Sequence, residues 1–480
     1  MKNFLINNIV EFWNSKSEAA KSAFVFTVAI LLSRGVSIIT TPIFTRIMPP
    51  DQIGVVGLFT SYLAIISSVS SLALNSGGFM VALKEYSNER DEYISSILTL
   101  TTLTSGILFF LLLLNPSFWS NFLGLPVGLL FLLLFGCVVT PAYEFWLMRQ
   151  RYEYQYKKGA ILTVLTSVLS TALAFIAVII AKDEPEQLGE LRIYVATGSS
   201  LLVYLVIWFI LFLKGKTYYN FKYWSFSLTL SIPLLGHSFA SQILSVSDRF
   251  FISKFVDNTA VGIYSTLYAV GTISLLFWGA LNASFIPYLF QNLETDYQKR
   301  EVNKTAAKLL GGFSLLTLFI ALTAPEISAI LAPKEYLNYV SIIPPIIAGV
   351  YFISVGNIYS NLLVYCKNTI AIMFCSVFAG IISIVLNILL IPRFGFIAAA
   401  YSTLFSYIVF ALFQALFSYY IFRKKFSGIF AYNNQLMIYI SLSTLLLTMF
   451  CIILYRYDIM RYCIMAFVIP LFLFFYKKQK

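Results

Sequence analysis

The composition of this 480-residue chain indicates a membrane protein. Hydrophobic residues make up 59% of it and charged residues only 11%, whereas a soluble domain is about 25% charged. The net charge is +12, but the basic residues are dispersed along the chain, which argues against nucleic-acid binding. A single histidine and five cysteines without paired spacing argue against a metal site or a Ser-His-Asp centre, and no cofactor is expected.

Residues 1–22 precede the first long apolar run. They are too long and too mixed in composition for a cleavable signal peptide, and no A-x-A cleavage site follows that run. The segment is predicted to be either a short interfacial helix or a frayed tail.

Fourteen apolar runs follow, and each approaches the roughly 20 residues that a spanning helix needs. They lie at about 24–44, 53–80, 93–114, 122–147, 159–181, 193–213, 227–247, 259–290, 309–332, 339–365, 370–391, 396–422, 431–454 and 459–476. We therefore expect an all-α integral membrane protein with about 14 transmembrane helices.

The basic residues predict the orientation of these spans. If the N-terminus is cytoplasmic, 23 lysines and arginines fall in cytoplasmic segments and 9 in external loops, and Arg34 lies inside a span. Cytoplasmic loops are enriched in Lys and Arg, so both termini are expected in the cytoplasm. No loop is long enough to form a separate domain.

A weak internal repeat predicts how the spans are grouped. Residues 46–62 resemble 254–270, and Gly54 aligns with Gly262 at an offset of 208. Repeats in the same orientation are a common way to build a transporter. The predicted order is a cytoplasmic segment (1–22), a six-helix bundle (23–213), a linker (214–226), a second six-helix bundle (227–422), and a helix pair with a cytoplasmic tail (423–480).

Four motifs between residues 42 and 407 carry a family resemblance. They are Pro42-x-x-x-Arg46 with Pro49-Pro50-Asp51-x-x-Gly54, Ser247-Asp248-Arg249-Phe250-Phe251-Ile252 with Val261-Gly262-Ile263-Tyr264, Ala332-Pro333-Lys334-x-Tyr336 before Pro344-Pro345, and Leu386-Asn387-x-x-Leu390-Ile391-Pro392-x-Phe394-Gly395 running on to Ser406-Tyr407. The chain resembles the Wzx-type polysaccharide (O-antigen) flippases, in the superfamily that contains the MATE exporters and the lipid II flippase. One departure is Ile397-Ala398-Ala399, where Gly-Ala-Ala is more usual.

The resemblance implies a MATE-like fold in a bacterial inner membrane and transport of an undecaprenyl-pyrophosphate-linked oligosaccharide to the periplasmic leaflet. It also implies that the chain is not an enzyme. Partners expected with such a role are the lipid-linked oligosaccharide, the phospholipid bilayer, a polysaccharide polymerase and a chain-length regulator.

Polar residues inside spans are the candidate site residues, because buried charge in a membrane is rarely without function. Arg34 lies midway along the first span, where a guanidinium receives phosphate oxygens or sugar hydroxyls, or else pairs with Glu144. In the seventh span, His237, Ser241, Ser245 and Asp248 share one helix face with Gln242 beside it, as either a cavity wall or an interhelical hydrogen-bonding face. Asp248 and Arg249 are also interpreted as boundary charges at the outer face.

Gating or ion coupling is assigned to Glu144, Asp248 and Lys367. The coupling ion is expected to be Na⁺ or H⁺, since an intramembrane carboxylate and a histidine are present. The alternative functions are a Na⁺- or H⁺-coupled MATE-type multidrug or metabolite exporter, a lipid II flippase, and a polysaccharide polymerase or glycosyltransferase. Polymerases and glycosyltransferases usually carry a large external loop or an early acidic pair, whereas the first external loop here has a single acid, Asp51.

Overall fold

A computed structural model describes residues 17–75, 78–426 and 429–466, which form helices joined by turns, with no strand among them. The long helices of the first half are α2 (Glu18–Ile47), α3 (Pro50–Ser70), α5 (Arg90–Leu114), α7 (Val127–Tyr152), α8 (Tyr156–Ile180) and α9 (Leu188–Gly215). Those of the second half are α10 (Phe221–Phe255), α11 (Asn258–Gly271), α12 (Ser274–Gln291), α13 (Asp296–Leu331), α15 (Ile343–Tyr365), α16 (Thr369–Phe394), α17 (Ile397–Lys425) and α18 (Asn434–Leu454). Short elements are α4 (Gly78–Glu85), α6 (Pro116–Leu123), α14 (Lys334–Leu337), η1 (Pro185–Gln187) and η2 (Val340–Ile342).

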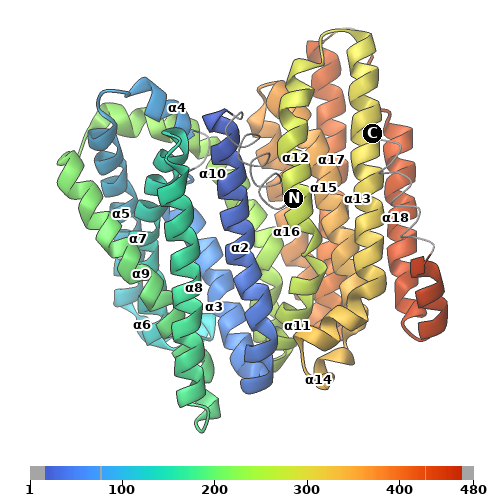
Figure 1. The fold of residues 1–480 in the computed structure, drawn as a ribbon, viewed down its shortest axis with the longest axis horizontal. Helices are drawn as coiled ribbons and strands as arrows, with labels where there is room; N and C mark the ends of the chain where they lie inside the picture. Colours follow the sequence, from blue (N-terminus) through green and yellow to red (C-terminus); the bar gives the residue numbers. More distant parts are fainter. Residues whose placement is uncertain (1–16, 76–77, 427–428, 467–480) are drawn as a thin grey trace, which may run out of the picture. The chain divides into compact units, whose positions relative to one another are not determined.

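The chain forms two compact units. Unit 1 comprises residues 1–49 and 62–235, and unit 2 comprises residues 50–61 and 236–480. Two helices, α3 and α10, therefore belong in part to each unit. Figure 1 shows the helices of each unit running alongside one another as a bundle.

The predicted spans correspond to real helices, although their number is smaller among the described residues. Eleven helices there are long and apolar enough to cross a membrane, or up to twelve if the bent pair α11–α12 is one span. The predicted seventh span, 227–247, lies within α10, a 35-residue helix that is not among these candidates. Most of the predicted fourteenth span, the N-terminal 1–16 and the C-terminal tail lie outside the described residues.

Two predicted spans are interrupted. The run at 53–80 is not one helix: α3 ends at Ser70, and Leu72 and Ala73 follow with φ of 50° each before α4 begins. A left-handed conformation is unfavourable for residues with a Cβ and stops helix propagation. The run at 259–290 is bent by 42° between α11 and α12. The apolar runs predicted neither break, although Ser, Asn and Gly residues at 70–78 and Gly271-Thr272 are typical of interruptions.

Helix boundaries in the two halves recur at similar offsets. The ends of α2 and α10, Ile47 and Phe255, are 208 residues apart, and so are the first residues of α3 and α11, Pro50 and Asn258. The first residues of α5 and α13 are 206 apart. Corresponding residues of the two halves can therefore be compared by position.

The core of unit 2 is built around α15, whose residues are mostly buried. It has no charged residue, and it contacts α11, α12, α13, α16, α17 and α18. Two glycines of α15 allow α17 to pack closely against it. A Cβ on Gly349 would lie 2.9 Å from the Tyr407 ring, and a Cβ on Gly356 would lie 2.5 Å from the Phe410 ring. Small residues at such contacts are typical of packed membrane helices.

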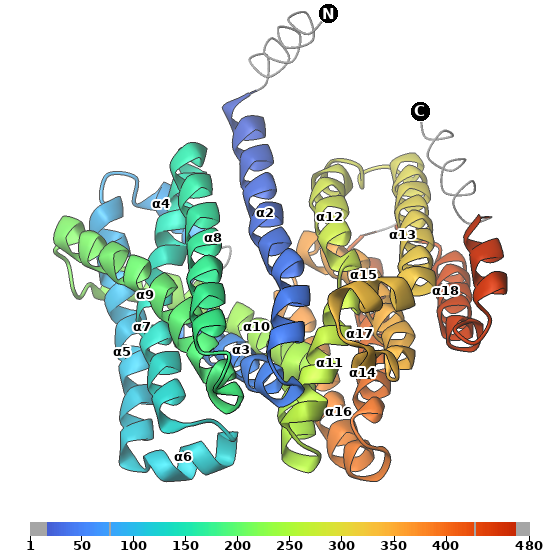
Figure 2. The ribbon, with the colours of Figure 1, turned by 60° about the horizontal axis from the view of Figure 1, so that its bottom comes forward.

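Unit 1 has an aromatic core at one end, where Phe79, Tyr86, Tyr93, Phe145 and Tyr223 pack on one another. Tyr93 and Ser227 share a hydrogen bond of 2.8 Å, which ties α5 to the start of α10. In Figure 2, α6 lies crosswise to α5 and α7 and joins their ends.

Candidate functional site

Arg34 lies in the middle of α2 with its side chain exposed. It forms no ion pair with any acidic side chain that the structure describes, so the predicted pairing with Glu144 is wrong for this state of the chain. A charged side chain at the bilayer centre costs about 2.5–3.5 kcal/mol, and such residues nearly always face a protein interior or a water-filled cavity. We therefore infer that the face of α2 that carries the exposed guanidinium is in contact with water.

The same face of α2 carries two hydroxyl residues at helical spacing, Ser37 and Thr41. By the 208-residue offset, Arg34, Ser37 and Thr41 correspond to Gln242, Ser245 and Arg249 on α10. Both helices therefore carry a polar stripe at corresponding positions in sequence. The stripe on α10 was expected from its sequence, whereas the one on α2 was missed, although it has the same signal of polar residues three and four positions apart.

A chain of hydrogen bonds lies at the level of Arg34 in unit 1. Ser33 on α2 donates to the carbonyl of Thr163 on α8 at 3.5 Å, and the Thr163 hydroxyl shares a 2.7 Å hydrogen bond with Tyr143 on α7. The next residue on α7 is Glu144, which accepts a 2.7 Å hydrogen bond from the Asn75 amide. Asn75 lies in the interrupted segment between α3 and α4, so the break places an amide beside α7.

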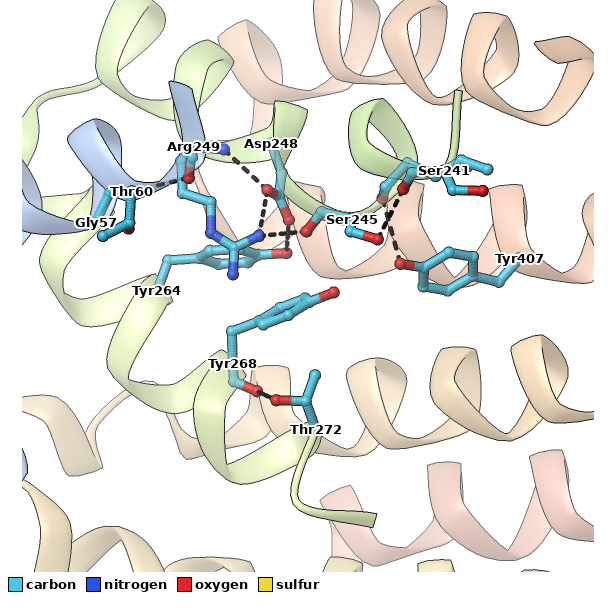
Figure 3. A network of polar contacts seen from close by, with 12 residues as sticks. Gly57, Thr60, Ser241, Ser245, Asp248, Arg249, Tyr264, Tyr268, Thr272 and Tyr407 are labelled. Carbon is cyan, nitrogen blue, oxygen red and sulfur yellow. Dashed lines mark hydrogen bonds and ion pairs between the residues drawn. The ribbon is translucent and has the colours of Figure 1, made fainter. Parts of the chain in front are cut away.

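Unit 2 contains a buried cluster of charged and aromatic residues on α10 and α11 (Figure 3). Asp248 accepts hydrogen bonds from the Arg249 side chain at 2.7 Å and from the Tyr264 hydroxyl at 2.6 Å. The Arg249 guanidinium lies 4.0 Å from the centre of the Tyr268 ring and donates to the carbonyl of Ser245 at 2.7 Å. Because the Asp248 carboxylate and the Arg249 guanidinium are buried side by side, each charge is neutralised by the other.

Asp248 and Arg249 are only 1% and 7% exposed, and α10 continues beyond them to Phe255. Their interpretation as boundary charges at the outer face stays a prediction. The three tyrosines around the pair, Tyr264, Tyr268 and Tyr407, were not predicted. Tyr407 donates to the carbonyl of Leu244 at 3.3 Å from α17, a helix remote in sequence that no local pattern connects to α10.

The other predicted residues of α10 are half-buried. His237 shares a 2.7 Å hydrogen bond with Ser376 on α16, which favours the simple interpretation of a histidine satisfied by a neighbour. The Ser241 carbonyl accepts a hydrogen bond from Ser245 at 2.8 Å. Gln242 makes no side-chain hydrogen bond with the part of the chain that the structure describes. Within the predicted stripe, His237 and Ser245 therefore have hydrogen-bond partners in the protein, whereas the Gln242 amide has none among the described residues.

Lys367 lies in the turn between α15 and α16, where its φ of 56° ends the helix. Its side chain is exposed. The turn is stabilised by the neighbouring Lys425, which donates to the carbonyl of Cys366 at 2.9 Å. The role of Lys367 in gating stays a prediction.

An apolar groove of about 470 Å³ lies in unit 2 between α15, α17 and α18. Its walls include Phe352, Ile408, Leu412, Met437 and Leu445. Its few polar groups include the Tyr359 hydroxyl, which donates to Asn434 at 2.9 Å. A groove of this composition fits a hydrocarbon chain better than a polar ligand.

Residues 19–293, more than half of the chain, match the family described as polysaccharide biosynthesis protein. A comparison with curated proteins finds no match.

Solved structures with a similar fold are membrane transporters. An inward closed lipid II flippase MurJ superposes with a TM-score of 0.62 at 17% identity, over 95% of this chain and 100% of that one. An inward-facing multidrug resistance MATE transporter superposes with a TM-score of 0.58 at 14% identity, over 84% of this chain and 96% of that one. A transporter of the MOP superfamily from Pyrococcus furiosus superposes with a TM-score of 0.57 at 15% identity, over 86% of this chain and 98% of that one. The expected MATE-like fold is confirmed, and the solved proteins that share it are transporters.

Proposed function

Because the chain belongs to the polysaccharide biosynthesis protein family, we propose that it flips an undecaprenyl-pyrophosphate-linked oligosaccharide, an O-antigen or capsule repeat unit. The movement runs from the cytoplasmic to the periplasmic leaflet of the bacterial inner membrane by alternating access. Both termini lie in the cytoplasm. The surplus of basic residues in the segments placed there supports this orientation.

The observation that carries the proposal is the exposed guanidinium of Arg34 in the middle of a spanning helix. Such a group receives a pyrophosphate through charge-assisted, bidentate hydrogen bonds. An exporter of organic cations would instead need an accessible carboxylate at this level, where α2 presents a cation. Hydroxyls of Ser37 and Thr41 beside it suit the sugar, which is rich in hydrogen-bonding groups.

The lipid part of the substrate needs a different surface, because its hydrocarbon tail cannot cross a wet cavity. The apolar groove between α15, α17 and α18 supports the proposal by offering a surface on which hydrocarbon can lie. The flipped unit is passed to a polysaccharide polymerase acting with a chain-length regulator, and a Na⁺ or H⁺ gradient drives the cycle.

A genetic experiment tests this function in the source cell. Removing the chain abolishes surface polysaccharide and leaves undecaprenyl-linked repeat units on the cytoplasmic side, and re-expression restores both. Normal polysaccharide in the depleted cell, combined with increased sensitivity to cationic dyes, would instead favour a MATE-type exporter. Retention of dye resistance together with loss of polysaccharide supports the flippase.

A further inference from the structure

Four carboxylates lie more than one turn from either end of a long helix among the described residues, and three of them have a basic partner; one of these is Glu301, which pairs with Lys304 at 2.7 Å. Asp248 pairs with Arg249 at 2.7 Å, and Glu326 pairs with Arg461 at 2.5 Å. Glu144, eight residues before the end of α7, forms no ion pair with any basic side chain that the structure describes. Its one hydrogen-bond donor among these residues is the Asn75 amide. A carboxylate in this position has no counter-ion in a medium that strongly disfavours isolated charge.

The corresponding position in the second half is neutral. Asn75 and Asn282 are 207 residues apart, and Glu144 and Asn361 are 217 apart, close to the 216 that separate the first residues of α7 and α15. In unit 2 the Asn361 amide donates to Asn282 at 2.8 Å, so two amides satisfy each other. Each half therefore joins the segment after its helix break to a later long helix, α7 or α15, through one polar pair. Only the pair of unit 1 contains a group that can gain or lose a proton.

The surroundings of Glu144 favour a proton over a metal ion. No group of three His, Cys, Asp or Glu side chains suited to a metal is found among the described residues. Beside Glu144 lie Tyr143 on the same helix and Tyr204 on α9, whose rings stack with centres 4.4 Å apart. Neither tyrosine supplies a positive charge, and Arg151, two turns further along α7, forms no ion pair with Glu144. Binding a proton removes the uncompensated charge without any further ligand.

We propose that Glu144 and Asn75 form a proton-binding site in unit 1. The proton resides on the Glu144 carboxyl while the Asn75 amide donates to the other oxygen. Loss of the proton leaves an anion that Asn75 alone stabilises, which changes the force between α7 and the interrupted segment after α3. The use of this proton to drive transport rests on the proposed function, whereas the site itself does not.

The site is tested by infrared spectroscopy on the full-length protein in lipid vesicles at neutral pH, where exposed carboxyls are ionised. The wild type is expected to show the carbonyl stretch of a protonated carboxylic acid, and Glu144→Gln is expected to lose it. Glu326→Gln, a matched change in a carboxylate that has an arginine partner, keeps the band. Asn75→Ala keeps the band but moves it to higher frequency, because the carbonyl oxygen loses its hydrogen bond.

A wild-type spectrum without this band, or a band that survives in Glu144→Gln, overturns the proposal. A band that does not move in Asn75→Ala overturns the part played by Asn75. The transport role has its own readout: a pH gradient across the vesicle accelerates movement of lipid-linked oligosaccharide by the wild type and by Glu326→Gln, but not by Glu144→Gln. A wild type that moves no oligosaccharide overturns the proposed function and leaves the infrared result standing.

Discussion

At the scale of single residues, the two arginines of the equivalent helices α2 and α10 differ in what surrounds them. Arg249 is buried against Asp248 and the Tyr268 ring, whereas Arg34 is exposed and lacks an acidic partner among the described residues. A compensated charge contributes to packing, and an uncompensated one is available to a ligand. The two residues are therefore expected to respond to substitution in different ways.

Replacing Arg34 is expected to affect transport without affecting folding. Arg34→Ala abolishes surface polysaccharide at normal protein level, because the pyrophosphate loses its guanidinium. Arg34→Lys retains part of it, since lysine keeps the charge but not the bidentate geometry. Polysaccharide and protein level are measured together on the same cells. Normal polysaccharide with Arg34→Ala would assign Arg34 to the structure.

Replacing Arg249 is expected to affect folding. Arg249→Met leaves Asp248 buried without its counter-ion, and breaking such a pair costs about 3–5 kcal/mol. The double variant Asp248→Asn with Arg249→Met loses less, because no charge remains to be compensated. The fraction of protein that remains folded after heating in detergent measures the loss of stability in the single and the double variant. Equal losses in the single and double variants would contradict the ion pair.

At the scale of elements, α3 and α11 pack through glycines that the repeat made equivalent. A Cβ on Gly54 would meet the backbone carbonyl of Asn258, and a Cβ on Gly262 would meet that of Pro50. Asn258 and Pro50 are themselves the equivalent first residues of the two helices. The contact is reciprocal, because each glycine lies against the first residue of the other helix.

Gly54→Ala is therefore expected to push α3 from α11 and to destabilise the protein by about 1–3 kcal/mol, the usual effect of overpacking. Gly279→Ala is the matched control on α12, because a Cβ there has no atom within 4 Å. It is expected to be neutral or to stabilise by about 0.5–1 kcal/mol. Thermal stability in detergent distinguishes the two, and equal behaviour would contradict the crossing.

The helices could be predicted from the sequence because apolar runs of spanning length are a strong signal. The breaks after Ser70 and Gly271 were missed although small and polar residues lie at both, because such residues are also common inside packed membrane helices. Among the site residues, Arg34 and Glu144 were identifiable as charges within spans. The partners Asn75 and Tyr264 depend on contacts between helices, which no single-helix pattern contains.

At the scale of the whole molecule, the orientation can be tested by labelling single cysteines with an impermeant maleimide in a Cys463→Ser background. Lys182→Cys and Arg393→Cys are expected to react in intact cells, and Lys216→Cys and Lys424→Cys only after the cells are opened. All four of these basic side chains are exposed. The remaining native cysteines are buried. The opposite pattern would reverse the proposed topology.

The central claim is that this protein moves a lipid-linked glycan across a bilayer, and reconstitution tests it most directly. Purified wild type in vesicles that contain a fluorescent undecaprenyl-pyrophosphate oligosaccharide is expected to transfer the lipid between leaflets faster than protein-free vesicles do. Arg34→Ala is expected to reduce the rate to that background. A wild-type rate no greater than that of protein-free vesicles would contradict the account.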